Sequence, residues 1–95
     1  MKKSELIKQF EFELRMNVVE MNKIRRFNRL QQVFEQYGYY EGAKILLNKD
    51  ETEGLVTLFD AGKTEISIEF LALSEKFQSL FSDDELKKCR RKLGI

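Results

Sequence analysis

The fold depends on residues 54–81, which read GLVTLFDAGKTEISIEFLALSEKFQSLF and carry two incompatible patterns. Ile66, Ile68 and Phe70 alternate with polar residues, which is typical of a strand and predicts a β-hairpin over 55–70. Apolar residues also recur at helical spacing, at Ile66, Phe70, Leu73, Phe77, Leu80 and Phe81. The alternation ends at residue 70 whereas the helical spacing continues. We therefore favour helices over 54–61 and 64–81, separated at Gly62, and keep an α+β fold as the alternative.

The chain before this stretch is expected to be helical. Apolar residues that share one helical stripe begin close to Ser4, a suitable N-cap: Leu6, Ile7, Phe10, Leu14, Val18 and Met21. Alternation over 10–18 leaves a strand as the rival interpretation. Asn17 and Glu20 have the spacing of a capping box and predict a break there, with helices over 4–16 and 17–37. Gly38 suits the end of the second helix, and a third is expected over 39–49.

A helical hairpin is predicted over residues 27–47. Apolar residues of the first helix would pack on the turn and on the second helix, through Phe27, Leu30, Phe34, Gly38, Tyr40, Ala43 and Leu47. This pattern resembles one tetratricopeptide-type repeat. The resemblance covers 21 residues, Gln31 replaces the usual small residue, and no second copy follows. Because such solenoids need several stacked repeats to bury a core, the resemblance implies an αα-hairpin and no particular partner.

The C-terminal segment has the clearest helix signals. Ser82 and Glu85 form a capping box, with acidic residues in the first turn and basic residues in the last. Gly94 suits the C-terminal end, so a helix is expected over 83–93. We therefore predict an all-α bundle of about five helices that forms a single domain over residues 1–95.

Composition excludes more chemistry than it suggests. The 95 residues include no His, no Trp, no Pro and one Cys, which excludes His-dependent triads, His metal sites and an internal disulfide. Cys89 lies among cations but has no His or second Cys beside it, so we expect it to be unreactive. Asp50, Glu51 and Glu53 lack EF-hand spacing and are expected to form a solvated loop. We expect no enzymatic activity, no cofactor, no bound metal, no membrane span or signal core, and a cytoplasmic location.

The net charge of +1 hides two basic clusters. They comprise Lys23, Arg25, Arg26 and Arg29, and then Lys87, Lys88, Arg90 and Arg91, with Lys92 beside them. Such side chains neutralise phosphates, but cations late in a helix also suit its dipole. Residues 55–82 have the outline of a helix-turn-helix with few cations in the reading position. A nucleic-acid-binding regulator is therefore the alternative function.

Aromatic residues exceed the needs of a small helical core. The chain has 8 Phe and 3 Tyr, and four apolar side chains are candidates for an exposed interface: Tyr39, Tyr40, Phe12 and Met16. Packing inside the core is the competing explanation. Since no catalytic constellation or metal site is found, we favour a small non-enzymatic binding protein that acts through protein–protein contacts. A regulator, inhibitor or adaptor fits this class, and self-association remains open.

Overall fold

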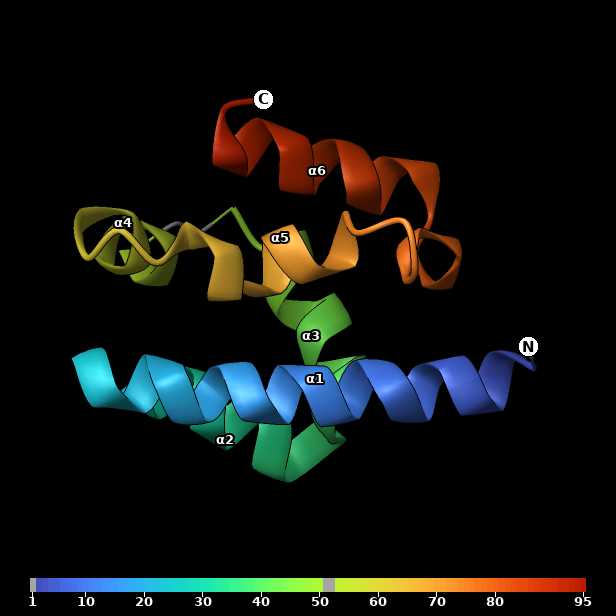
Figure 1. The fold of residues 1–95 in the computed structure, drawn as a ribbon, viewed down its shortest axis with the longest axis horizontal. Coiled ribbons are helices and arrows are strands. Elements are labelled where there is room, and N and C mark those ends of the chain that lie inside the picture. Colours follow the sequence, from blue (N-terminus) through green and yellow to red (C-terminus); the bar gives the residue numbers. More distant parts are fainter. Residues whose placement is uncertain (1, 51–52) are drawn as a thin grey trace.

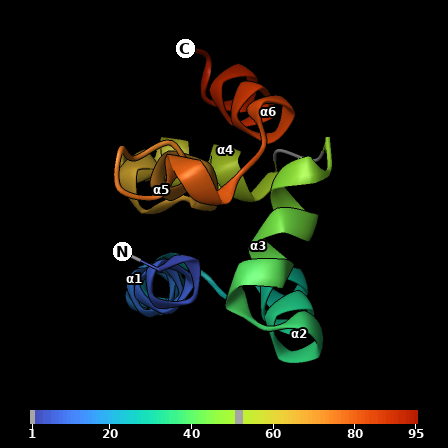
Figure 2. The ribbon, with the colours of Figure 1, turned by 90° about the vertical axis from the view of Figure 1, so that its right-hand side faces the viewer.

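Helices make up all the regular structure in residues 2–50 and 53–95, which are the residues that the computed structural model describes. There are six α-helices and two short 3-10 helices in this part of the chain: α1 (Lys3–Ile24), α2 (Asn28–Tyr37), α3 (Tyr39–Asn48), α4 (Glu53–Asp60), η1 (Thr64–Ile66), α5 (Ile68–Ala72), η2 (Gln78–Leu80) and α6 (Asp83–Leu93). Figure 1 shows α1 and α6 on opposite sides of α4 and α5. Figure 2 shows α3 running from beside α1 toward α6. The all-α prediction is confirmed. The alternative β-hairpin over 55–70 is wrong, because α4, η1 and α5 occupy that segment.

Helix α1 continues through the predicted break at residue 17. Phe10, Leu14 and Met21 are all buried on one side of α1, so an unbroken helix places the whole stripe against the core. The helix starts after Lys2, and Ser4 lies inside it rather than at the cap. It ends at Arg25, whose backbone is extended (φ −164°, ψ 168°), and the chain turns there without Gly or Pro. The predicted division into 4–16 and 17–37 is therefore wrong.

The αα-hairpin of α2 and α3 is confirmed. Gly38 joins the two helices with a φ of 83°, and its N–H donates to the Phe34 carbonyl at 2.9 Å. Gly42 lets the helices approach closely, since a Cβ at this position would lie 2.8 Å from Phe34 Cδ1. A glycine inside α3 is therefore a packing requirement of the hairpin.

The segment 64–81 is divided into short helices instead of the continuous helix we predicted. The Ser67 hydroxyl accepts a hydrogen bond from the Phe70 N–H at 3.1 Å and so starts α5. At the other end, Ser74 Oγ donates to the Leu71 carbonyl at 2.9 Å and Gln78 Nε2 donates to the Leu73 carbonyl at 2.8 Å. These side chains satisfy carbonyl groups that a longer helix would use, and α5 ends after five residues.

Helix α6 has the predicted caps at both ends. Ser82 and Glu85 form a reciprocal capping box, with hydrogen bonds of 3.1 Å and 2.9 Å between side chain and backbone. Gly94 has a φ of 76°, and the Ile95 N–H donates to the Arg90 carbonyl at 2.9 Å. Both ends of α6 are thus set by local sequence.

Phe10 lies at the centre of an aromatic cluster that joins α1 to α3 and to the segment before α6. Its ring centroid is 5.3 Å from those of Phe77 and Phe81 and 6.0 Å from that of Tyr40. The Tyr40 hydroxyl donates to the Leu80 carbonyl at 2.6 Å. The polar end of this buried ring is therefore satisfied, which stabilises its position in the core.

A buried lysine connects α3, α5 and α6. Lys92 Nζ donates to the carbonyls of Leu46 and Leu47 at 3.3 Å and 2.9 Å, at the C-terminal end of α3. It also lies 3.5 Å from Glu69 Oε2, and the two side chains are only 4% and 11% exposed. Lys92 of α6 thus caps the C-terminal end of α3, and the Glu69 carboxylate balances its charge.

Lys92→Met is expected to lower the free energy of unfolding by about 3 kcal/mol, because it leaves the Glu69 carboxylate buried without its cation. Chemical denaturation followed by circular dichroism measures this loss. Lys87→Met is the matched control, since Lys87 is exposed on the same helix, and a change within about 0.5 kcal/mol is expected there. Equal losses in the two variants would contradict a structural role for Lys92.

Candidate protein-interaction surface

Three large apolar side chains in the middle of α1 are exposed on one side of the helix. Phe12, Met16 and Val19 are 65%, 53% and 50% exposed. At 100° per residue they fall within an arc of about 60°, on the opposite side of α1 from Phe10 and Leu14. Figure 2 looks along α1 and shows other helices above it and on one side only. We call Phe12, Met16 and Val19 the outer stripe.

Two of the four predicted interface residues, Phe12 and Met16, lie in the outer stripe. Tyr39 is half-buried, with its ring centroid 4.8 Å from that of Phe34 and the Arg15 guanidinium 5.5 Å from its face. Tyr40 is buried in the aromatic cluster and is not available at the surface, so its prediction as an exposed contact is wrong. It lies two residues after Gly38, and its side chain points inward, where its hydroxyl donates to the Leu80 carbonyl.

The sequence analysis missed Val19, although its spacing from Phe12 and Met16 is that of a helical stripe. Other large apolar side chains are exposed at the C-terminal end of α1 and in other parts of the chain, namely Ile24, Tyr37, Val56, Phe59, Phe70 and Ile95. We had placed Phe70 on the buried stripe of a long helix. That placement is wrong because the interruption after α5 changes the helical phase, and Ile68 and Leu71 are buried instead.

The first basic cluster lies where α1 meets α2, and several of its members have neighbours. Lys23 Nζ lies 3.2 Å from Glu20 Oε1, and the Arg25 guanidinium lies 4.9 Å from the Phe27 ring centroid. Arg25 and Arg29 line a cavity, whereas Arg26 lies beside a polar depression between α1 and α2. The cluster therefore spreads around the helix junction.

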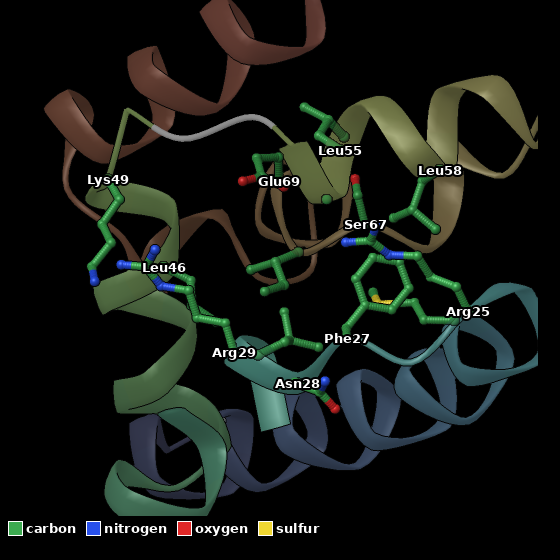
Figure 3. Close-up of a pocket in the computed structure, with 14 residues that line it drawn as sticks. Arg25, Phe27, Asn28, Arg29, Leu46, Lys49, Leu55, Leu58, Ser67 and Glu69 are labelled. Atoms are coloured by element: carbon green, nitrogen blue, oxygen red, sulfur yellow. The ribbon is translucent and has the colours of Figure 1, made fainter. Parts of the chain in front are cut away.

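The cavity is bounded by the α1–α2 junction, the end of α3, α4 and the start of α5. Its volume is about 170 Å³, and its lining is mixed. The apolar residues are Met21, Phe27, Leu30, Leu46, Leu55, Leu58 and Ile68, and the polar or charged residues are Arg25, Asn28, Arg29, Lys49, Ser67 and Glu69. Figure 3 shows Arg29 and Lys49 on one side and Arg25 above Phe27 on the other. A cavity of about 150 Å³ accommodates a benzene ring, so this one has room for a group of about that size.

The second basic cluster is divided between surface and interior. Lys87 and Arg90 are exposed, and Lys88 Nζ donates to Asn48 Oδ1 at 3.2 Å. Arg91 lies 3.9 Å from Asp50, and Lys92 is buried as described above. The end of α3 thus lies between the two basic clusters, because Lys49 of this segment shares the cavity with Arg25 and Arg29.

The helix-turn-helix outline over 55–82 is not formed. Between α4 and α6, the described chain has only η1, the five-residue α5 and η2. Residues 74–82, where the reading helix of such a module would lie, contain turns and a 3-10 helix. No second helix of this segment is long enough to lie along a groove.

Cys89 is completely buried in the core. Burial raises the pKa of its thiol from the ordinary 9.0 to about 12, and the Glu69 carboxylate adds to the increase, although Lys92 opposes it. The surrounding cations therefore do not produce a thiolate, and an unreactive structural residue is what the environment favours.

Cys89 is expected to resist alkylation by iodoacetamide at pH 8 in the native protein and to react quickly in denaturant. Since the folded pKa is the higher one, the stability gained by keeping this thiol neutral is complete below about pH 9 and is lost as the pH rises toward 12. Mass spectrometry of the alkylated protein measures the reaction. Rapid labelling of the native protein would contradict the buried position.

Among the described residues, no group of three or more His, Cys, Asp or Glu side chains is positioned to hold a metal ion. Of the acidic segment predicted to form a solvated loop, residues 51 and 52 lie outside the described residues. Within residues 2–50 and 53–95, no helix combines the length and the apolar character needed to span a membrane.

Comparison with protein-family models, curated proteins and solved structures finds no match to this chain.

Proposed function

We propose that this chain is a small non-enzymatic binding protein that acts through protein–protein contacts on the outer face of α1. The outer stripe is the observation that supports the proposal. A role as a cytoplasmic regulator, inhibitor or adaptor belongs to the same proposal.

The alignment of the outer stripe distinguishes it from scattered apolar exposure. Single exposed apolar residues are ordinary on protein surfaces, whereas side chains aligned on one helix face form the anchors that fill a partner's groove. Phe12, Met16 and Val19 extend over about 10 Å of helix. The exposed pair on α4, Val56 and Phe59, belongs to a helix of only eight residues. The α1 face is therefore the better candidate.

Phe12→Asp is expected to abolish capture of the binding partner, because a carboxylate within the outer stripe must be desolvated on contact. Affinity capture with the immobilised protein, followed by mass spectrometry, measures the loss. Phe59→Asp is the matched control, since Phe59 and Phe12 are 67% and 65% exposed. Circular dichroism checks that both variants fold.

Capture that survives Phe12→Asp and Met16→Asp but is lost with Phe59→Asp would move the interface to α4 and overturn the proposal for α1. Loss with Phe12→Asp alone supports it.

Nucleic-acid binding is the second candidate function. The gathering of Arg25, Arg29 and Lys49 around one cavity supports it, because three cations at one surface can contact neighbouring phosphates. Lys23 and Arg26 on the α1–α2 side and Lys87, Lys88, Arg90 and Arg91 on α6 would extend this contact.

Binding to duplex DNA or RNA, measured by fluorescence anisotropy, is then expected to weaken steeply between about 50 and 200 mM salt. Replacing Arg25, Arg26 and Arg29 together by Gln reduces both the affinity and the salt dependence. Absence of binding at low salt would exclude this second function.

A further inference from the structure

We propose that the outer face of α1 pairs in antiparallel orientation with the same face of a second copy of this chain. This inference rests on the proposed function, because it names the partner of the surface described there. The order of side chains along α1 identifies a second copy of this chain as the partner.

The outer face has a spacing that suits pairing between two helices. Six residues follow one another at intervals of four, three, four, three and four: Glu5, Gln9, Phe12, Met16, Val19 and Lys23. This alternation is the repeat that keeps one face of a helix against a partner helix. The outer stripe occupies the middle of the series, and charged residues occupy its two ends.

The series is also symmetric about residue 14. In an antiparallel pair with its two-fold axis there, Phe12 of one copy faces Met16 of the other, and Gln9 faces Val19. Such a two-fold contact is isologous: both copies use the same surface, so each apolar contact occurs twice. The apolar side chains of one copy are thereby covered by those of the other.

The charges at the ends favour the antiparallel orientation. Glu5 and Lys23 each lie about 13.5 Å along the helix from residue 14, on the outer face. Antiparallel pairing places Glu5 of one copy opposite Lys23 of the other at both ends, whereas parallel pairing places like charges together. Lys23 contacts Glu20 within its own helix, but both side chains are more than half exposed. Exchanging that partner therefore costs little.

Glu13 and Arg15, the charged residues on either side of residue 14, are held away from the contact between the two copies of α1. Glu13 Oε2 lies 3.0 Å from Lys76 Nζ, on the side of α1 that faces the segment after α5. The Arg15 guanidinium lies over the Tyr39 ring on the other side. In the antiparallel pair, Glu13 of one copy lies near Glu13 of the other, and Arg15 lies near Arg15. Because each of these side chains contacts a residue of its own chain, the like charges are turned away from each other and the centre of the contact is apolar.

The surface has room for a second copy. Figure 1 shows α1 along its length in front of α2 and α3, and Figure 2 shows its outer side without a covering helix. α1 has 22 residues, which corresponds to a length of about 33 Å. Two copies therefore approach along α1 without rearranging the described helices.

Sedimentation equilibrium over a range from about 1 μM to 1 mM tests the pairing. We expect a monomer–dimer equilibrium that Phe12→Asp shifts to monomer and that Phe59→Asp leaves unchanged. Glu5→Lys and Lys23→Glu are each expected to weaken the dimer about tenfold in low salt, and the two changes together restore it. A chain that remains monomeric over the whole range overturns the inference.

Disulfide trapping tests the orientation, and Cys89 does not interfere because it is fully buried. A mixture of Gln9→Cys and Val19→Cys proteins is expected to form a mixed disulfide. Gln9→Cys alone should not, because two copies of residue 9 would be about 15 Å apart along the axis. Cross-linking of Gln9→Cys to itself would indicate parallel pairing and overturn the inference.

The outcomes separate this inference from the proposed function. A monomeric chain whose capture of a different protein is still lost with Phe12→Asp removes self-pairing and keeps α1 as a binding surface. A chain that is monomeric and whose captured proteins are unaffected by Phe12→Asp removes both.

Discussion

Burial of Phe10 is the constraint on which the arrangement of the other elements depends. Its ring contacts Tyr40 of α3 and Phe77 and Phe81 of the segment before α6, so one side chain joins three distant parts of the sequence. It also fixes the rotation of α1, because Leu14 and Met21 follow on the same side. Once the inner side is fixed, Phe12 and Met16 must face outward.

The sequence predicted those features of the fold that depend on neighbouring residues. The capping box at Ser82, the glycines at 38 and 94 and the αα-hairpin are local, and all are found. The division of 64–81 depends on hydroxyl groups that compete with the backbone, and Ser74 gives no periodic signal of this role. The sequence did not predict the break after Ile24. It depends on a contact with a distant part of the chain, since Phe27 lies outside the helices and packs with Met21 and Leu58.

Candidate surface residues were harder to predict, since charge and aromatic character do not specify exposure. Lys92 belongs to a run of cations in the sequence, yet its ammonium group caps α3 and pairs with Glu69 inside the protein. Tyr40 follows Tyr39 directly, but only Tyr40 enters the core. Phe12 and Met16 were distinguishable because they lie off the main stripe of α1. The position of a residue around α1 relative to the buried Phe10 therefore identified the exposed side chains better than residue type did.

The outer stripe also has an energetic argument of its own. Phe and Val have lower helix propensities than Ala, Lys or Glu, so Phe12 and Val19 weaken α1 as an isolated helix. Neither side chain recovers this loss within the chain, because each is at least half exposed. Burial of the same side chains against a second surface removes apolar area from water and does recover it. Helix α1 is thus held by its inner side and is left with an outer side whose residues gain stability only in contact with a partner.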